Sequence, residues 1–254
     1  MSSFTTSPNP PPNDSSESHP AVPTALSPSL QRGDGPAFEL KYLLGDEAAQ
    51  VEHWARQHML PDPHGRDGTY ATTSLYCDTE ALDVFHRRPG FRRNKYRLRR
   101  YEAGELIHLE RKRRQGDKVR KRREVMPLDQ LTLLQSETFD DQQPFAWFLR
   151  SLRLRQLRPA ARVAYDRTAF HGPGIRLTID RNLRGERAAE WNLLPLMEGR
   201  PLLEGKAVLE LKFAGLLPGL FRDLLASLPG QMPGGVSKYR LCLRAEGMTE
   251  CPNG

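Results

Sequence analysis

Residues 95–101, Lys-Tyr-Arg-Leu-Arg-Arg-Tyr, and residues 106–114, Leu-Ile-His-Leu-Glu-Arg-Lys-Arg-Arg, carry the clearest structural signal in the sequence. Successive side chains of a β-strand point to opposite faces, so alternate residues share one surface. The first stretch then has a basic face made of Lys95, Arg97 and Arg99. The second has an apolar face opposite a charged face made of His108, Glu110, Lys112 and Arg114. Both stretches therefore predict strands with one strongly charged face.

The same alternation recurs in residues 38–42, 175–180 and 208–213. Taken singly, each of these is an ordinary half-exposed strand with its charges in solvent. Taken together they are unusual, because the pattern Glu-x-Lys occurs three times, at Glu39/Lys41, Glu110/Lys112 and Glu210/Lys212. We therefore expect the charged faces to converge on one hydrated cavity while the apolar faces pack on helices.

Short alternating runs separated by turn signals extend from Phe38 onward. The predicted strands are 38–44, 72–77, 95–101, 106–114, 118–126, 162–170, 175–182, 207–213 and 237–244. The predicted helices lie near 46–59, 144–156 and 216–228, and the apolar stripe of the last one indicates a core-facing helix. Closely spaced strands favour antiparallel pairing, so the pattern predicts an α+β fold with a large sheet or a closed barrel.

The composition divides the chain into three parts. Residues 1–36 are rich in Pro, Ser, Asn and Thr, which predicts a disordered leader. We expect residues 37–246 to form one domain and residues 247–254 to form a flexible tail. The chain has 3 cysteines in no ligand spacing, which argues against a disulfide framework or a zinc site. No apolar run is long enough to span a membrane and no signal peptide is visible, so we expect a soluble cytoplasmic protein.

Positive charge is concentrated in one part of the chain. The net charge is +7, but residues 87–123 contain 17 Lys and Arg against 4 Asp and Glu, so this segment carries +13 and the remainder −6. A cavity lined by so many like charges must be wet and hold counter-charge, and a phosphate chain suits Arg forks and Lys point charges. A carboxylate beside phosphate needs a hard cation between them, which predicts Mg²⁺ or Mn²⁺.

Nine motifs in order resemble the signature strands of VTC-type polyphosphate polymerases, within the CYTH-like triphosphate tunnel metalloenzyme superfamily. They are Phe38-Glu-Leu-Lys-Tyr, Ser74-Leu-Tyr-Cys-Asp, Lys95-Tyr-Arg-Leu-Arg-Arg-Tyr, Leu109-Glu-Arg-Lys, Val119-Arg-Lys-Arg-Arg, Tyr165-Asp-Arg-Thr-Ala-Phe, Ile175-Arg-Leu-Thr-Ile-Asp, Val208-Leu-Glu-Leu-Lys-Phe and Ser237-Lys-Tyr. The resemblance implies a closed antiparallel β-barrel of about eight strands that forms a tunnel, with flanking helices. It also implies a compact, bacterial version, since the SPX domain and membrane spans of eukaryotic members are absent from this sequence.

The resemblance assigns roles to particular residues. It makes Arg97, Arg99, Arg167 and Arg176 catalytic and Lys41, Lys112, Lys121, Lys212 and Lys238 substrate-binding. It makes Glu210 the principal metal ligand, with Glu39 and Glu110 as helpers. The sequence departs from the ExExK pattern of superfamily relatives, because Ala37 stands two residues before Glu39.

Some assignments keep alternatives. The run 120–123 allows several registers, and a slip of one residue would turn Lys121 to the other face. Asp180 is interpreted as a capping or ion-pairing residue, and Tyr76 and Tyr101 as packing residues rather than base-stacking groups.

Three functions remain open at this point. The first is transfer of the γ-phosphoryl group of ATP to a growing polyphosphate, without a protein nucleophile. The second is hydrolysis of tripolyphosphate or a nucleoside triphosphate in the same cavity. The third is a non-catalytic binder of polyphosphate or nucleic acid, which the basic run alone would permit; no recognition motif for nucleic acid is visible, so nucleic acid is not the expected partner.

Overall fold

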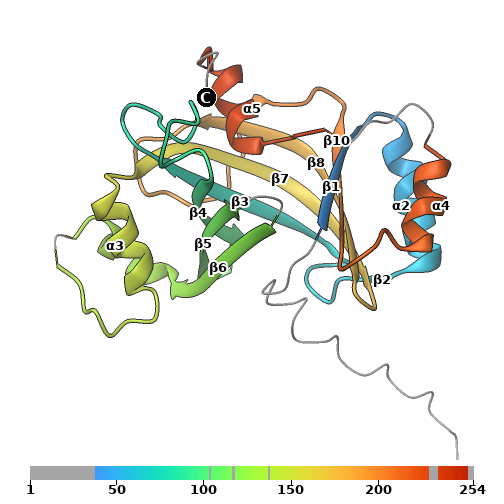
Figure 1. Cartoon of the computed structure of the whole chain (residues 1–254), viewed down its shortest axis with the longest axis horizontal. Helices are drawn as coiled ribbons and strands as arrows, with labels where there is room; N and C mark the ends of the chain where they lie inside the picture. The colour runs from blue at the N-terminus through green and yellow to red at the C-terminus, as the bar shows by residue number, and fades with distance from the viewer. Residues whose placement is uncertain (1–37, 103, 116–117, 137, 229–233, 251–254) are drawn as a thin grey trace, which may run out of the picture.

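The structure is a computed structural model that describes residues 38–102, 104–115, 118–136, 138–228 and 234–250. The predicted leader, residues 1–36, lies outside the described residues, as do residues 251–254 of the predicted tail. Figure 1 shows the path of the chain, with a strongly curved sheet at the centre and helices on its outer side.

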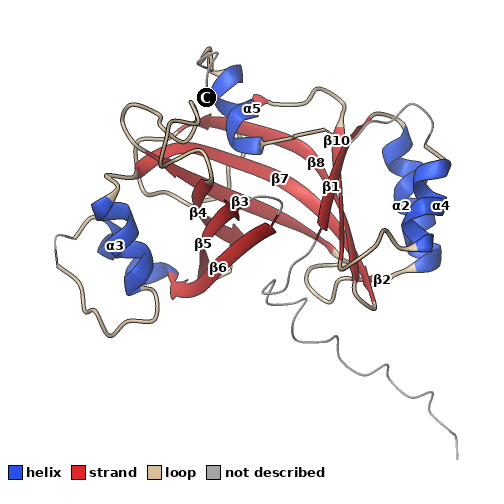
Figure 2. Cartoon of the chain, viewed as in Figure 1, coloured by secondary structure: helices blue, strands red, loops and turns tan. Residues whose placement is uncertain are grey.

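Ten strands form one sheet in which every described pairing is antiparallel (Figure 2). The strands are β1 (Phe38–Leu44), β2 (Leu60–Pro61), β3 (Thr69–Asp78), β4 (Asn94–Tyr101), β5 (Leu106–Gln115), β6 (Lys118–Pro127), β7 (Arg158–Gly172), β8 (Ile175–Arg187), β9 (Arg200–Pro201) and β10 (Ala207–Phe213). The main order is β1-β10-β8-β7-β3-β4-β5-β6, with β2 on β7 and β9 on β8. Eight of the nine predicted strands are confirmed, whereas β2 and β9 were not predicted.

The sheet is not closed, so the predicted closed barrel is wrong in this respect. Strands β1 and β6 are the two edges, and no backbone pairing joins them within the described part of the chain. Side chains bridge the two halves instead, since Lys112 Nζ on β5 lies 3.0 Å from Glu39 Oε2 on β1. Alternation in the sequence determines which face a residue occupies, but it does not determine whether the edge strands pair.

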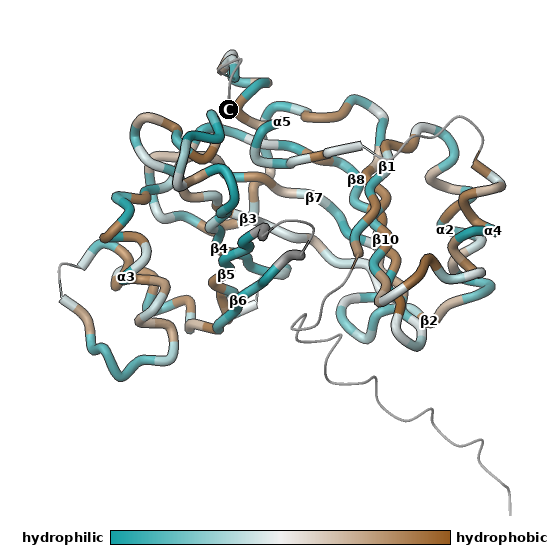
Figure 3. Tube along the Cα trace, in the orientation of Figure 1, coloured by the Kyte–Doolittle hydropathy of each residue, from teal (hydrophilic) through white to brown (hydrophobic). Residues whose placement is uncertain are grey.

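Two helices cover the outer face of β1, β10 and β8. They are α2 (Glu47–His58) and α4 (Gly219–Ala226), which lie side by side in Figure 1. Leu209 and Leu211 of β10 belong to one buried cluster with Val51 of α2 and Phe221 of α4. Figure 3 shows this arrangement as apolar segments of β10 facing apolar segments of the helices. Both helices were predicted, and burial of one face explains the alternation along β10.

A second cluster covers the outer face of β4 to β6. It contains Leu98, Ile107 and Leu109 from the strands and Phe148 from α3 (Ala146–Leu154). A 3-10 helix, η1 (Leu128–Leu134), packs beside it and was not predicted. This helical layer, like the first one, leaves the opposite, charged face of the strands turned inward.

Helix α5 (Lys238–Ala245) corrects the prediction of a strand over residues 237–244. Its buried residues are Tyr239, Cys242 and Leu243, which follow the spacing of a helix rather than the alternation of a strand. Tyr239 stacks on Tyr76 of β3, with ring centroids 5.4 Å apart. Among the described residues, no helix is both long and apolar enough to cross a membrane.

Candidate functional site

The inner face of the curved sheet encloses a cavity of about 510 Å³. Its walls come from β1, β3 to β8 and β10, together with the start of α5. Of the described residues, eleven Lys and Arg side chains line it, against four carboxylates. Like charges at this density repel each other strongly, so the cavity is built to receive an anion with several charges.

All twelve residues predicted for the site line this cavity. They are Lys41, Arg97, Arg99, Lys112, Lys121, Arg167, Arg176, Lys212, Lys238, Glu39, Glu110 and Glu210. The ambiguous run 120–123 adopts the register that turns Lys121 inward, and it brings Arg123 to the cavity as well. Lys238 reaches the cavity from the first turn of a helix rather than from the predicted strand.

Glu39 and Glu210 form an acidic pair on the neighbouring strands β1 and β10. Lys41 Nζ bridges them, at 2.8 Å from Glu39 Oε1 and 2.9 Å from Glu210 Oε2. Lys212 Nζ lies 2.8 Å from Glu210 Oε1, and Lys112 Nζ lies 3.0 Å from Glu39 Oε2. Burial and Glu210 raise the pKa of Glu39, but the surrounding lysines outweigh them and lower it to about 2. Burial also raises the pKa of Glu210, but Lys212, Lys41 and Arg167 hold it well below its ordinary value, so both carboxylates are ionised at neutral pH.

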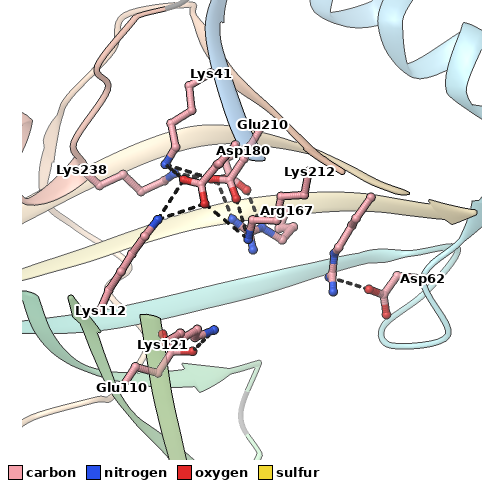
Figure 4. Close-up of polar contacts among 12 residues, drawn as sticks. Lys41, Asp62, Glu110, Lys112, Lys121, Arg167, Asp180, Glu210, Lys212 and Lys238 are labelled. Carbon is pink, nitrogen blue, oxygen red and sulfur yellow. Dashed lines mark hydrogen bonds and ion pairs between the residues drawn. The ribbon is translucent and has the colours of Figure 1, made fainter. Parts of the chain in front are cut away.

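Glu110 lies on β5, apart from Glu210 (Figure 4). Its carboxylate is 2% exposed and is surrounded by Arg97 Nε at 2.5 Å, Lys121 Nζ at 2.7 Å and Arg123 Nη2 at 2.6 Å. Burial raises the pKa of Glu110, but these cations and Arg99 hold it well below its ordinary value. Glu110 thus fixes the orientation of the basic side chains of β4 and β6.

Asp180 has the same positioning role on β8. Its carboxylate is fully buried and accepts two hydrogen bonds from Arg167, from Nε at 2.7 Å and from Nη2 at 2.9 Å. Lys238 Nζ also donates to it, at 2.6 Å. Burial raises the pKa of Asp180, but Arg167 and Lys238 outweigh this and lower it. The structure therefore agrees with the ion-pairing interpretation of this residue.

Arg176 lies toward another part of the wall, where Figure 4 shows Asp62 apart from the central cluster. Arg176 Nη2 donates to Asp62 Oδ2 at 2.6 Å and to the Tyr70 hydroxyl at 3.1 Å. Asp62 was not predicted, because it lies in the short connection after β2 and has no strand alternation to mark it.

Two basic residues of β4 contact no carboxylate within ion-pair distance in the described part of the chain. Lys95 Nζ donates to Ser237 Oγ at 3.1 Å, and Arg99 Nε donates to Ser74 Oγ at 3.1 Å. Burial, together with Lys41 and other cations, lowers the pKa of Lys95 to about 7. Lys95 shares the alternation of Arg97 and Arg99, so the sequence contained the signal that marks it as a site residue.

Aromatic residues complete the wall. Tyr76 and Tyr101, which were predicted to be packing residues, both line the cavity. Burial raises the pKa of Tyr101, but Arg99 and Arg123 outweigh it and lower this pKa to about 7. The Tyr165 ring lies beneath three cations, with its centroid 4.6 Å from Lys238 Nζ. Cation–π contacts with this ring therefore stabilise cations whose charge the carboxylates neutralise only in part.

The carboxylates of the cavity fit a hard divalent cation only if phosphate oxygens of a substrate complete its coordination. The described residues contain no group of three or more His, Cys, Asp or Glu that could hold a metal ion. Glu39 and Glu210 supply two ionised carboxylates in one place, whereas three cations already surround the oxygens of Glu110. Magnesium is commonly bound by one or two carboxylates together with phosphate oxygens and water, so the Glu39–Glu210 pair fits such a role.

Fold and cavity together define a curved antiparallel sheet whose inner face carries a strongly basic cavity. Residues 37–245 match the VTC domain family, so the chain belongs to that family. No curated protein matches the chain.

Several solved structures are similar in fold. A Bacillus halodurans protein described as a candidate adenylate cyclase is 16% identical over 80% of this chain and 95% of its own, with a TM-score of 0.49. The Hippeastrum protein HpAC1, for which a dominant triphosphatase activity is described, is 15% identical over 83% of this chain and 96% of its own, with a TM-score of 0.45. The PH1819 protein of Pyrococcus horikoshii is 10% identical over 82% of this chain and 99% of its own, with a TM-score of 0.43. These similarities concern the fold alone.

Proposed function

We propose that this protein is a metal-dependent polyphosphate polymerase, which transfers the γ-phosphoryl group of ATP to a growing polyphosphate chain. The observation that carries the proposal is the cavity itself, in which eleven basic side chains converge in a member of the VTC domain family. A chain of phosphates supplies the repeated negative charge that such a wall needs.

Phosphoryl transfer requires positioning and charge stabilisation more than covalent help from the protein. In the proposed step, an oxygen of the terminal phosphate of the acceptor chain attacks the γ-phosphorus. The bond from that phosphorus to the β,γ-bridging oxygen breaks, and ADP leaves with the electron pair. Arg97, Arg99 and Arg167 stabilise the charge on the transferred group, and Arg176 aligns the far end of the substrate.

The lysines have to exchange partners for this reaction. Lys41 and Lys212 now neutralise Glu210, and Lys112 neutralises Glu39. When phosphates enter, these ammonium groups turn to phosphate oxygens, which leaves the two carboxylates beside a polyanion. A Mg²⁺ or Mn²⁺ ion held by Glu210 and Glu39 would neutralise that repulsion and polarise the phosphate oxygens.

The reaction belongs in the cytoplasm under this proposal, because ATP is available there. The partners are then ATP and polyphosphate, and nucleic acid is not required.

Product analysis tests the proposal. Purified protein is incubated with ATP and Mn²⁺, and the products are separated on a gel stained for polyphosphate while ADP is measured in parallel. The proposal predicts long polymer in step with ADP, and none after addition of EDTA. Release of orthophosphate without polymer would establish the hydrolase instead. Tight polyphosphate binding in EDTA, without any turnover when metal is present, would establish the non-catalytic binder.

A further inference from the structure

Four arginines form a ladder on the outer face of β5 and β6, opposite to the cavity. The register places Arg111 across from Arg122 and Arg113 across from Arg120. Arg113, Arg120 and Arg122 are exposed, and Arg111 is partly exposed. These four residues, called the outer arginine ladder below, point away from Lys112 and Lys121 because neighbouring residues of a strand alternate.

Among the described residues, Glu124 on the outer face of β6 attracts Arg122 electrostatically, but it forms no ion pair with any arginine of the outer arginine ladder. Like charges directly opposite each other on a sheet are destabilising. In the part of the chain that the structure describes, no carboxylate lies within ion-pair distance of any of the four, and two of them, Arg111 and Arg122, contact an aromatic ring. The Arg122 guanidinium carbon lies 4.4 Å from the centroid of the Trp147 ring on α3, and that of Arg111 lies 5.6 Å from it. Stacking on an indole orients arginines without consuming their charge.

The position of the ladder connects it with the cavity. Strand β6 is an edge of the sheet, so no further strand separates its inner face from its outer face. Lys121 and Arg123 line the cavity, whereas Arg120 and Arg122 lie on the outside of the same strand. A chain that leaves the cavity over this edge passes from the inner cations Lys121 and Arg123 to the outer cations Arg120 and Arg122.

We propose that the outer arginine ladder binds the emerging polyphosphate chain, and so retains the product between successive transfers. This inference rests on the proposed polymerase function. A linear polyphosphate fits, because it carries charge along its whole length and Arg forks bind phosphate oxygens in pairs. The geometry favours it over single-stranded nucleic acid, whose bases gain affinity by stacking on free aromatic faces, since Arg122 already lies over Trp147. The geometry also favours polyphosphate over a membrane, which would need exposed apolar side chains beside the arginines. The exposed large apolar residues of the two strands, Leu106 and Val125, lie instead on the inner face, opposite to the outer arginine ladder.

Binding and product length test the inference. The variant R113Q/R120Q removes the two arginines that do not contact Trp147, and the control R222Q/K206Q removes two exposed charges that lie outside the cavity. Binding of long polyphosphate and of tripolyphosphate is measured by titration of the full chain without ATP. We expect R113Q/R120Q to bind long polyphosphate roughly tenfold more weakly at low salt, as two exposed ion pairs allow. Tripolyphosphate affinity should not change, and polymer made from ATP should be shorter at an unchanged initial rate.

The outcomes separate this inference from the proposed function. If R113Q/R120Q binds long polyphosphate more weakly than the unchanged protein, but the unchanged protein makes no polymer, the outer arginine ladder is a polyphosphate-binding site and the proposed polymerase function is wrong. If active R113Q/R120Q enzyme binds long polyphosphate as tightly as the unchanged protein and makes polymer of the same length, the proposed role of the outer arginine ladder is wrong and the polymerase function stands. The ladder is also rejected if the control variant loses as much affinity, or if single-stranded RNA or anionic lipid vesicles bind it more tightly than polyphosphate of equal charge.

Discussion

Lys95 is a cavity cation that contacts Ser237 and forms no ion pair with a carboxylate in the part of the chain that the structure describes. Burial and neighbouring cations, of which Lys41 contributes most, lower its pKa to about 7. The protonated form attracts phosphate, and it is lost as the pH rises through this value. Tyr101, with a pKa of about 7, gains negative charge in the same range and acts in the same direction.

We therefore expect kcat/KM for ATP to fall as the pH rises above about 7, since this ratio reports groups of the free enzyme. In Lys95→Arg the charge persists to higher pH, so the fall should become shallower. The measurement is a pH profile of kcat/KM for both proteins. Identical profiles would show that Lys95 does not contribute to the titration.

Glu210 offers a second test at the scale of one residue. Its carboxylate is the more deeply buried of the acidic pair, with 8% of the side chain exposed against 19% for Glu39, so a metal ion bound there would be better shielded from water. Glu210→Gln should lower kcat at saturating Mn²⁺ by at least about a hundredfold, which is typical for loss of a charge-stabilising group. Circular dichroism and thermal unfolding should show an intact fold. Turnover close to that of the unchanged protein would refute the metal assignment.

Strand alternation predicted which residues share the cavity, and it succeeded because a charged face and an apolar face cannot exchange sides without burying charge. It could not predict Asp62, which lies in a connection, or the depressed pKa of Tyr101, which depends on three different strands meeting. The inward register of Lys121 also required the structure, because all four residues 120–123 are basic.

At the scale of elements, Asp180 joins β8 to β7 and α5. Its buried carboxylate accepts hydrogen bonds from Arg167 and Lys238. Asp180→Asn would leave two largely buried cations without their counter-charge, which costs about 3 kcal/mol or more of unfolding free energy. Urea denaturation measures this loss. Asp166→Asn on β7, which is partly exposed and pairs with Asn182, serves as the control and should cost far less.

Helix α5 shows why one element was mispredicted. Residues 237–244 contain both a short alternation and a helical spacing of buried residues, and a short segment does not distinguish the two. Packing of Tyr239 on Tyr76 and of its hydroxyl on Asp78, 2.5 Å away, favours the helix. The two-residue strands β2 and β9 are too short for any periodicity to appear.

At the scale of the whole molecule, the cavity holds more positive than negative charge, and this excess opposes folding until an anion is bound. A ligand that binds only the folded state raises the melting temperature. We expect tripolyphosphate to raise Tm, and to do so more at low ionic strength than at high ionic strength, because salt screens the attraction. Differential scanning calorimetry with sodium sulfate at matched ionic strength is the control. An equal shift with sulfate would indicate a general salt effect rather than a polyanion site.

The sequence predicted an antiparallel sheet with an inward charged face, and the structure confirms that arrangement. The alternation of residues could not show whether the two edge strands of the sheet pair with each other. Backbone pairing was expected there, and the structure has side-chain ion pairs instead, such as Lys112 with Glu39.

The proposed function requires that this one cavity bind the triphosphate of ATP. A crystal structure of the full chain with Mn²⁺ and a non-hydrolysable ATP analogue would locate the triphosphate. We expect it to lie among Lys41, Arg97 and Arg167, with the metal ion between its oxygens and Glu210. A triphosphate bound on the outer surface, with the ion pairs of the cavity unchanged, would contradict this expectation.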